Sequence, residues 1–386
     1  MNEILELFLK IYENFEKPVA LSEPKVDKND IEEVISTLKS GNVSSIGQVI
    51  VNFENEISKN YDNKNVVAVN SGTSALHLSL ISSNVKNNSE VIVQPLTFVA
   101  TINAIRYCSA IPTFIDINLQ NLSLDVEKLN GFIENDCKYK NGVLINKNTN
   151  REISAIIMVD VFGNIGNQKE VFDICKKYKI NLIIDAAESI GAKRYGYSSG
   201  HFSDIVTTSF NGNKIITSGM GGAVISKSSE IIEKIRHLSS TANIGKSSYE
   251  FIHEEVGFNY RLPALNAALG LSQIKNLDKK IAMRKNVYEF YKKAFSEESL
   301  IALHTSAEEH TNHWLNSVSL IEIKSQKAKL RIIKELNKNG IQVRDVWKLH
   351  NLNKINQDCY NSDLTNSEIF YLNNINIPSG FNSDEP

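Results

Sequence analysis

Short apolar segments alternate with longer amphipathic ones between about residue 65 and residue 230. The apolar segments have the length and the β-branched content of buried strands, and the segments between them have helical spacing. The predicted strands are Val66–Val69, Glu90–Val93, Thr113–Asp116, Ala155–Val159, Asn181–Asp185 and Ala223–Ser226. Strands that alternate with crossover helices predict an α/β fold whose sheet is largely parallel. Ligands of such sheets bind beyond the carboxyl ends of the strands, so the residues that follow each strand are candidates for a site.

Other patterns precede and follow this region. The first eleven residues mix acidic with apolar side chains, which predicts a short amphipathic helix rather than a secretory signal. Residues 123–153 are polar and predict a helix followed by a surface hairpin or loop. A helical pattern from about Pro263 to Ser296 precedes a region with few strand signals, where the clearest strand begins near His313. We predict three parts: a helical N-terminal extension over 1–20, a large domain over 21–270 and a smaller C-terminal α+β domain over 271–386.

The composition argues against several classes of function. The chain of 386 residues carries 42 basic and 44 acidic side chains, a balance that indicates no nucleic-acid or membrane-surface partner. No apolar run is long enough to cross a membrane. The four cysteines are scattered and lack the spacing of metal ligands, so we expect reduced thiols and no metal site. Together these observations predict a cytoplasmic protein.

Two strand ends carry polar residues that suit a phosphorylated cofactor. The segment Asn70–Ser74 opens a helix with hydroxyl groups and a glycine, and the free N–H groups of such a first turn can bind a phosphate. Ordinary helix capping explains the same residues equally well. Asp185 ends an apolar strand, three residues before Glu188. A carboxylate there can keep a pyridinium nitrogen protonated, although a helix N-cap is an equally good interpretation.

Lys214 lies in a turn rich in asparagine and glycine that begins after Ser209. Such a turn can enclose an amine and keep it available as a neutral nucleophile, whereas most lysines of this chain are expected to be solvated. The nearby glycines, Gly219, Gly221 and Gly222, favour close approach of the backbone to a ligand. Phe98 follows another strand and offers its ring to a planar cofactor, or to the core.

The order and spacing of these motifs resemble the DegT/DnrJ/EryC1/StrS family. Its members are sugar aminotransferases that depend on pyridoxal 5'-phosphate and have the aspartate-aminotransferase (fold type I) architecture. The resemblance covers about residues 20 to 380 and rests on these motifs: Ser71-Gly-Thr, Pro95-x-Thr-Phe, Asp185-Ala-Ala-Glu, Ser209-Phe-x-x-x-Lys and Gly257-x-Asn-Tyr-Arg. The chain looks most similar to the LegC-like branch of the family. That branch aminates C4 of nucleotide-linked 4-keto-6-deoxy-N-acetylhexosamines in the synthesis of legionaminic acid or of bacillosamine-type sugars.

The resemblance implies a role for each motif. Lys214 would bind the cofactor as a Schiff base, and Asp185 would pair with the pyridine nitrogen. Glu188 would contact the ring hydroxyl, at a position where many relatives carry glutamine or histidine. Met220 departs from the family pattern, which has glutamate there. The other implied contacts are Gly72, Thr73, Ser74 and Ser209 at the phosphate, Phe98 on the ring, and Asn259 from the second subunit of a homodimer.

The implied reaction moves the amino group of L-glutamate to a nucleotide sugar, and three other functions compete with it. A sugar dehydratase on the same fold would have histidine in place of Lys214. A catalytically silent nucleotide-sugar-binding regulator would not need the lysine. An oxidoreductase would need a Gly-x-Gly-x-x-Gly motif, which the run Phe162–Asn167 lacks. A GDP-linked 4-keto-6-deoxymannose or a 3-keto sugar also stays open as the substrate. Residues that could contact the substrate, or serve only the fold, are His313, Trp314, Arg344 and His350.

Overall fold

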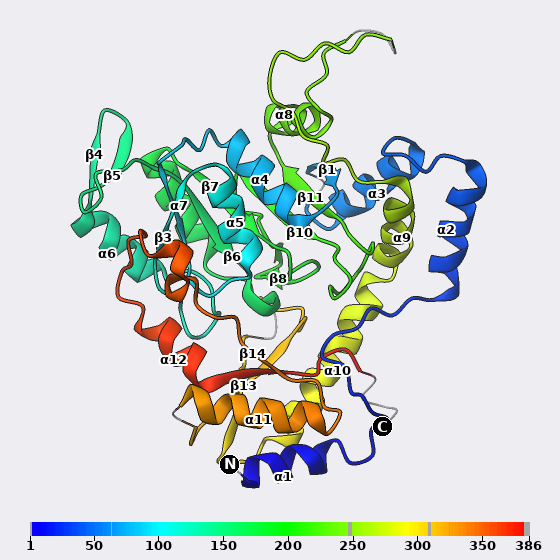
Figure 1. Ribbon diagram of the computed structural model, residues 1–386, viewed down its shortest axis with the longest axis vertical. Coiled ribbons are helices and arrows are strands. Elements are labelled where there is room, and N and C mark those ends of the chain that lie inside the picture. Colours follow the sequence, from blue (N-terminus) through cyan, green and yellow to red (C-terminus); the bar gives the residue numbers. More distant parts are fainter. Residues whose placement is uncertain (1, 63, 246–248, 308–309, 324, 382–386) are drawn as a thin grey trace.

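The computed structural model describes residues 2–62, 64–245, 249–307, 310–323 and 325–381. Within these ranges the chain forms a larger body around one mixed sheet and a smaller body around a second sheet (Figure 1). The larger body is drawn uppermost in Figure 1, and both ends of the chain lie at the smaller one.

The sheet of the larger body has seven strands in the order β1-β11-β10-β7-β6-β2-β3. Neighbouring strands from β10 to β3 pair in parallel, whereas β11 runs antiparallel to β1 and to β10. The mixed, mostly parallel sheet confirms the predicted fold class. Its strands are β1 (Asn65–Val69), β2 (Glu90–Val93), β3 (Ile111–Phe114), β6 (Ile153–Val159), β7 (Asn181–Asp185), β10 (Ile205–Ser209) and β11 (Gly222–Ser226).

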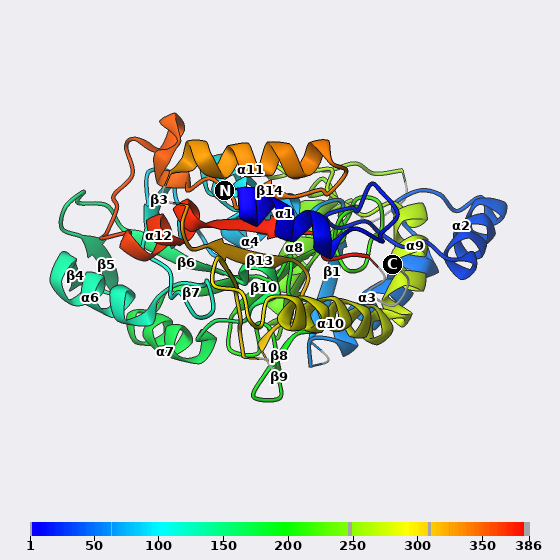
Figure 2. The same ribbon diagram turned by 90° about the horizontal axis from the view of Figure 1, so that it is seen from below.

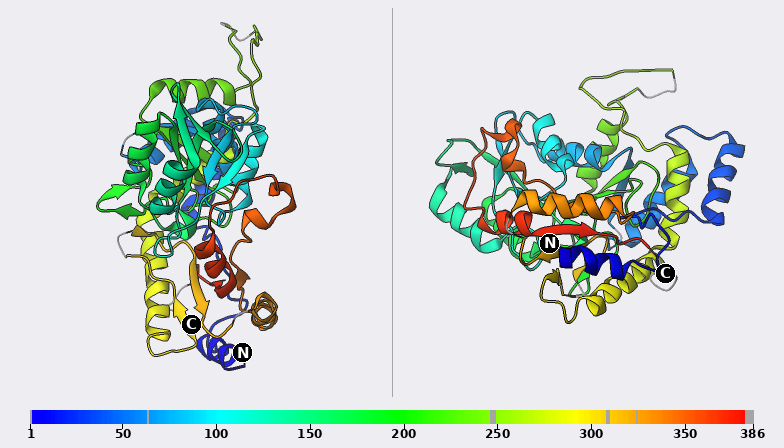
Figure 3. Two further views of the ribbon diagram at one scale, coloured as in Figure 1. Left: turned by 90° about the vertical axis from the view of Figure 1, so that its left-hand side faces the viewer. Right: turned by 60° about the horizontal axis from the view of Figure 1, so that its bottom comes forward.

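Six of these strands fall on the predicted segments, and β10 was not predicted. Every residue of β10 is buried, as are all residues of β2, β3 and β11. Burial on both sides is expected because helices cover the two faces of the sheet (Figures 1 and 3). The helices of this body are α2 (Lys28–Ser40), α3 (Gln48–Lys59), α4 (Gly72–Ser82), α5 (Val99–Tyr107), α6 (Val126–Asp136), α7 (Gln168–Tyr178), α8 (Ser229–Ser239) and α9 (Ala264–Lys275).

The polar stretch after α6 forms a hairpin, as predicted. Strands β4 (Cys137–Lys140) and β5 (Val143–Asn146) pair antiparallel at the edge of the larger body. A second small pair consists of β8 (Lys193–Arg194) and β9 (Tyr197–Ser198). All four cysteines are free thiols. In the described part of the chain, no helix is both long and apolar enough to span a membrane.

The smaller body has a four-stranded antiparallel sheet in the order β12-β13-β15-β14. The N-terminal helix α1 (Asn2–Ile11) joins it, since Ile4 and Phe8 are buried in the same apolar cluster as Leu336 and Ile377. Figure 2 shows α1 beside α11 under this sheet. The other elements are β12 (Ile301–Leu303), β13 (Asn316–Leu320), α11 (Gln326–Lys338), β14 (Arg344–Asp345), α12 (Thr365–Asn373) and β15 (Asn374–Ile377).

Helix α10 (Leu277–Ala294) belongs to both bodies. Its first turn packs into the core of the larger body through Leu277 and Ile281, whereas Val287 and Tyr291 are buried in the core of the smaller one. The predicted helical stretch is thus two helices, α9 and α10, which meet at Asn276. The predicted boundary at 270/271 stays a prediction, and we propose that the division lies inside α10.

The segment after β14 returns to the larger body. The N–H of His350 donates to the carbonyl of Pro95 (3.1 Å), and the His350 ring reaches the carbonyl of Thr97 through Nε2 (3.1 Å). The Asn353 side-chain amide contacts Nδ1 at 3.1 Å. A neutral ring satisfies both contacts, because Nε2 then donates and Nδ1 accepts. Burial lowers the pKa of His350 to about 4.

We expect His350 to make the free energy of unfolding decrease as the pH is lowered. Its pKa is about 4 in the folded chain and about 6.5 in an unfolded one. The unfolded chain therefore takes up the proton first, and stability present above pH 6.5 is lost as the pH falls toward 4. The free energy of unfolding, measured with urea at several pH values, should depend less steeply on pH in His350→Gln than in wild type. The difference in slope should reach about 1.4 kcal/mol per pH unit in this window. The exposed histidine variant His253→Gln should keep the wild-type slope, and an equal slope in His350→Gln would contradict the assignment.

Candidate active site

A cavity of about 260 Å³ lies where several strands of the large sheet end. The carboxyl ends of β6, β7 and β10 point to one edge of the sheet because these strands are parallel. β1 ends at the same edge, since it is antiparallel to β11, which is itself antiparallel to β10. The cavity is lined by these predicted residues: Gly72, Thr73, Phe98, Asp185, Glu188, Ser209 and Lys214.

The side chain of Lys214 is held inside this cavity by Glu188. Lys214 Nζ donates to Glu188 Oε1 at 3.0 Å, and the two side chains are only 12% and 4% exposed. The ammonium also lies 4.0 Å from the centre of the Trp314 ring system, a cation–π distance. The general prediction that a lysine of this chain is solvated therefore does not apply to Lys214.

Glu188 is fixed from its other side by a backbone N–H. Its Oε2 accepts from the N–H of Phe162 at 2.9 Å, and Phe162 has a φ of 56° in the left-handed region. A bulky residue rarely adopts that conformation, and strain of this kind is concentrated at functional sites. The run that begins at Phe162 thus positions a carboxylate beside the lysine. Burial raises the pKa of Glu188, and the nearby Lys214 opposes that rise.

Asp185 lies at the end of β7, deep in the same cavity. Its Oδ2 accepts from the Thr101 hydroxyl at 2.8 Å, and its Oδ1 accepts from the N–H of Ala187 at 3.2 Å. Thr97 contacts the Thr101 hydroxyl at 2.9 Å and completes a buried chain of hydroxyl groups. Burial raises the pKa of Asp185, against these hydrogen bonds and the charge of Lys214. A buried carboxylate in this state is stabilised by a cation, such as a pyridinium N–H, brought to it.

The first turn of α4 closes the cavity opposite the lysine turn. The Ser71 hydroxyl caps this helix by accepting from the N–H of Ser74 at 3.1 Å. A Cβ on Gly72 would lie 2.9 Å from Cβ of Ser209, so only glycine lets the two segments approach this closely. Gly222 is equally confined, since its Cβ would lie 2.6 Å from the N atom of Gly72. A helix N-terminus with hydroxyls on both sides is a suitable phosphate cradle.

The glycines after Lys214 serve the packing of the chain more than contact with a ligand. Among Gly219, Gly221 and Gly222, only Gly221 borders the cavity. A Cβ on Gly221 would lie 2.3 Å from the Ser218 hydroxyl oxygen. Gly219 has a φ of 79°, which a residue with a side chain rarely adopts. The sequence predicted that all three glycines let the backbone approach a ligand. The structure corrects this prediction for Gly219 and Gly222.

Two predicted cofactor contacts lie away from the cavity of this single chain. The Ser74 hydroxyl donates to Oδ1 of Asn70 at 2.7 Å. Ser71 lines the cavity, but Ser74 does not. Asn259 is exposed, and its carbonyl accepts from the Asn70 side chain at 3.3 Å. The phosphate role of Ser74 and the arrival of Asn259 from a second subunit stay predictions.

The four candidate substrate neighbours separate into two pairs. Trp314 and Arg344 line the cavity, and burial lowers the pKa of Arg344 while the charge of Glu188 opposes this. His313 instead stacks on Tyr288 with ring centres 4.3 Å apart. His350 is engaged by the loop at Pro95 and Thr97 described above. Neither histidine lines the cavity of this chain, and contact of either with the substrate stays a prediction.

Sequence reasoning missed several residues that shape the cavity. Trp347 lines it and packs against Phe98 and Phe162, with ring centres 6.0 and 4.9 Å away. Asn213 lines it too, and its carbonyl accepts from Nε1 of Trp314 at 2.9 Å. Local sequence could not reveal Trp347, because it follows β14 of the smaller sheet and reaches the cavity only where the chain returns to the larger body. The adjacency of Asn213 to Lys214 was visible in the sequence.

The groups around this cavity fit pyridoxal 5'-phosphate. The cradle at Gly72 and Ser209 suits the phosphate, the buried Asp185 suits a protonated ring nitrogen, and Lys214 supplies an amine for the aldehyde. The chain superposes on Helicobacter pylori PseC, an aminotransferase involved in the biosynthesis of pseudoaminic acid. The TM-score is 0.84, with 26% sequence identity and 96% of each chain covered. Fold and site together define a fold type I, pyridoxal-phosphate-dependent aminotransferase.

Sequence comparisons give the family. A model of the DegT/DnrJ/EryC1/StrS aminotransferase family matches residues 24–384, and the chain belongs to that family. The chain is 30% identical over 363 residues to the GDP-perosamine synthase of Caulobacter vibrioides, with 94% of this chain and 93% of that protein covered. It is 31% identical over 312 residues to the UDP-4-amino-4,6-dideoxy-N-acetyl-beta-L-altrosamine transaminase of Campylobacter jejuni, with 81% and 75% covered.

We expect Asp185→Asn to retain the cofactor but to lose turnover. The amide keeps a hydrogen bond to Thr101, yet it removes the negative charge that favours a protonated ring nitrogen. The kcat should fall about 10²–10³-fold, the size expected for one lost electrostatic contact in a dry site. Steady-state kinetics with cofactor content measured in parallel checks this. The exposed Asp173→Asn should behave as wild type, and unchanged turnover in Asp185→Asn would rule out the role.

Glu188 should determine the acid limb of the pH profile. Because its pKa is raised, Glu188 becomes neutral at a higher pH than an ordinary glutamate, and the negative charge beside Lys214 Nζ is then lost. We expect kcat/KM to fall as the pH decreases toward this raised pKa. In Glu188→Gln the limb should be absent, while the exposed Glu32→Gln keeps it. An unchanged acid limb in Glu188→Gln would assign the limb to another group.

Proposed function

We propose that this enzyme transfers the amino group of L-glutamate to the C4 ketone of a nucleotide-linked 4-keto-6-deoxy-N-acetylhexosamine. The product would serve the synthesis of a surface sugar of the legionaminic acid or bacillosamine type. The observation that carries the proposal is the buried contact between Lys214 and Glu188 in the same cavity as Asp185. A binding protein without activity would have no need to keep this reactive lysine buried and oriented.

The chain's residues divide the work of the reaction. Pyridoxal 5'-phosphate supplies an aldehyde and an electron-withdrawing ring when bound. Once the amino acid has displaced it, Lys214 Nζ would take the proton from the α-carbon of the amino acid and would deliver it to the carbon on the other side of the amino nitrogen, a 1,3-proton shift. Glu188 accepts a hydrogen bond from that amine and keeps it directed into the cavity. Asp185 would hold the proton on the ring nitrogen, and the paired rings of Phe98 and Trp347 line the cavity.

The sugar class is supported by the relatives and by the shape of the cavity. The Campylobacter jejuni relative is named for a UDP-linked 4-amino-4,6-dideoxy-N-acetyl sugar, which has the same C4 chemistry. Arg344 reaches the cavity from the smaller body, and no hydrogen-bond partner of its buried Nε lies within the described residues. A polar substrate group could therefore bind Arg344. Aromatic rings from both bodies provide faces for a sugar ring.

A GDP-linked 4-keto-6-deoxymannose is the second candidate substrate. It is favoured by the Caulobacter vibrioides relative, which is named a GDP-perosamine synthase and is covered over 93% of its length. The two candidates share amination at C4 and differ in the base and in the group at C2 of the sugar.

A homodimer with shared active sites is also part of the proposal. Residues 243–245 and 249–256 project from the larger body (Figure 3), and the second of these segments exposes Tyr249 (82%) and Phe251 (75%). Apolar side chains exposed together on one segment are typical of a protein interface. A second copy that covers them could place its Asn259 near the cofactor phosphate. Glutamate as donor and a cytoplasmic location remain predictions from the sequence.

Replacing Lys214 with Ala should abolish turnover and the visible absorbance of the lysine-bound cofactor. The purified protein would be incubated with glutamate and a panel of UDP- and GDP-linked 4-keto sugars, and aminated products identified by mass spectrometry. Wild type should aminate the UDP-linked N-acetyl sugars most efficiently. The exposed Lys169→Ala serves as the control. Normal turnover in Lys214→Ala would contradict the mechanism, and preference for the GDP-linked sugar would select the second candidate.

A further inference from the structure

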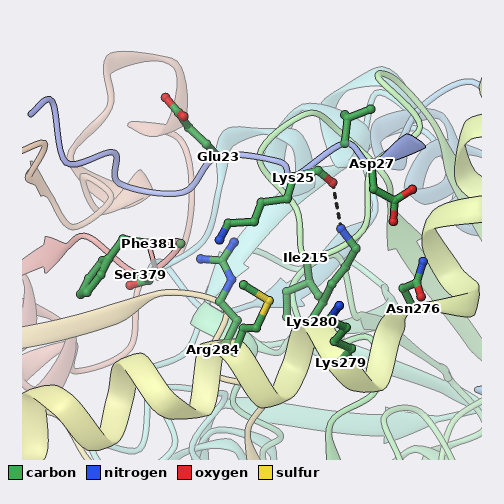
Figure 4. Close-up of a pocket in the computed structure, with 13 residues that line it drawn as sticks. Glu23, Lys25, Asp27, Ile215, Asn276, Lys279, Lys280, Arg284, Ser379 and Phe381 are labelled. Atoms are coloured by element: carbon green, nitrogen blue, oxygen red, sulfur yellow. Dashed lines mark hydrogen bonds between the residues drawn. The ribbon is translucent and has the colours of Figure 1, made fainter. Parts of the chain in front are cut away.

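A second cavity, of about 360 Å³, lies on the other side of the lysine turn. It is formed by residues 23–27, the first half of α10 and residues 379–381, and it shares no lining residue with the active-site cavity. Figure 4 shows these segments and their side chains. Ile215, the residue after Lys214, borders this cavity, so the two cavities are separated by the turn that carries the lysine.

Arg284 forms the buried end of this cavity. The residue is 7% exposed, and its Nη2 donates to the Ser22 hydroxyl at 3.0 Å. Its Nη1 lies 3.4 Å from the carbonyl of Trp314. Within the described ranges no carboxylate lies within 4.0 Å of this guanidinium. Burial lowers the pKa of Arg284 to about 10, so it is charged at neutral pH. A buried charge without a counterion is costly, and a bound anion removes that cost.

Two lysines add positive charge to the same space. In Figure 4 the ammonium of Lys25 lies beside the guanidinium of Arg284. Lys280 Nζ donates to the carbonyl of Lys25 at 3.0 Å. The carboxylates of Glu23 and Asp27, which also border the cavity, point away from the guanidinium in this view. The cations of Lys25 and Arg284 thus lie together, which favours an anionic ligand, while the charge of Lys280 is shared with Asp27 and Asp30.

We propose that this cavity binds the phosphate group of a small anionic molecule. A phosphate group carries up to two negative charges and presents oxygens in several directions, which matches cations that approach from three residues. Arg284 would donate to it at the buried end, with Lys25 and Lys280 on the solvent side. The organic part of the molecule would contact Met283 and Phe381, which line the wall of the cavity.

The site is connected to the lysine turn by short contacts. The Ser22 hydroxyl, which accepts from Arg284, donates to the carbonyl of Asn213 at 2.9 Å. The same carbonyl accepts from Nε1 of Trp314, whose ring lies against Lys214. A ligand that draws the guanidinium toward it would therefore act, through Ser22, on Asn213 and Trp314, which border the active-site cavity. The binding proposal itself does not depend on which sugar the enzyme uses.

The test is titration of the cofactor-loaded enzyme with inorganic phosphate at constant ionic strength. Loading with pyridoxal 5'-phosphate occupies the cradle at α4, so added phosphate reports on the second cavity. Calorimetry should show one phosphate per chain, and the melting temperature should rise more than in matched chloride. Arg284→Met should weaken this binding at least about tenfold, the value of one charge-assisted contact. The exposed Arg331→Met should bind phosphate as wild type does.

Because Arg284→Met removes a buried side chain, a second variant protects the test against misfolding. Lys25→Gln combined with Lys280→Gln changes the solvent side of the cavity and should also weaken phosphate binding. Phenyl phosphate that binds more tightly than phosphate would indicate a phosphorylated metabolite, and equal affinities would indicate free phosphate; both support the proposal. Unchanged affinity in folded Arg284→Met or in the double variant would overturn it. Binding of glutarate in place of phosphate would overturn it too.

Discussion

The buried contact between the Lys214 ammonium and the Glu188 carboxylate constrains much of the surrounding structure. A charge pair with little exposure persists only if further hydrogen bonds hold its members, because desolvation costs several kcal/mol per ion. Glu188 therefore requires the Phe162 N–H, which in turn requires the left-handed turn after β6. Trp314, which directly precedes the segment leading into β13 of the smaller sheet, lies over the ammonium. The Lys214 amine is thus held by strand ends, by a strained turn and by residues that lead into the smaller sheet. These contacts distinguish it from the other lysines of a lysine-rich chain.

Much of this arrangement could be predicted from local sequence, for a physical reason. Buried parallel strands must be apolar along their length, so six of the seven strands in the large sheet were visible, and the polar residues just after them marked the site. Strand β10 escaped because its sequence, Ile205–Ser209, ends in hydroxyl residues. The hydroxyls of Thr207 and Thr208 contact the carbonyls of Ile184 and Ala186 at 3.4 and 3.3 Å, which lets polar side chains lie in a buried strand.

Contacts between distant segments set the limit of that prediction. The family motifs located the cofactor residues, yet they gave no sign that Trp347 would cover Phe98, because the two are brought together only by the return of the chain after β14. The same return explains why His350, a reasonable substrate neighbour by residue type, is occupied by a loop carbonyl instead. The environment of Arg284 was equally hidden: among the described residues no carboxylate lies within 4.0 Å of its guanidinium, and no local pattern tells whether a carboxylate will reach an arginine on a helix.

Helix α10 gives the molecule a mechanical property that neither body has alone. One continuous helix is anchored in the core of the larger body at its beginning and in the core of the smaller body toward its end. A helix resists bending far more than a loop does, so the two bodies cannot swing about a flexible hinge at this connection. Any relative movement of the two bodies would have to tilt α10, and Arg284, which lies between its two anchored parts, would move with it. A change in the angle between the bodies would therefore also shift the guanidinium that borders the second cavity.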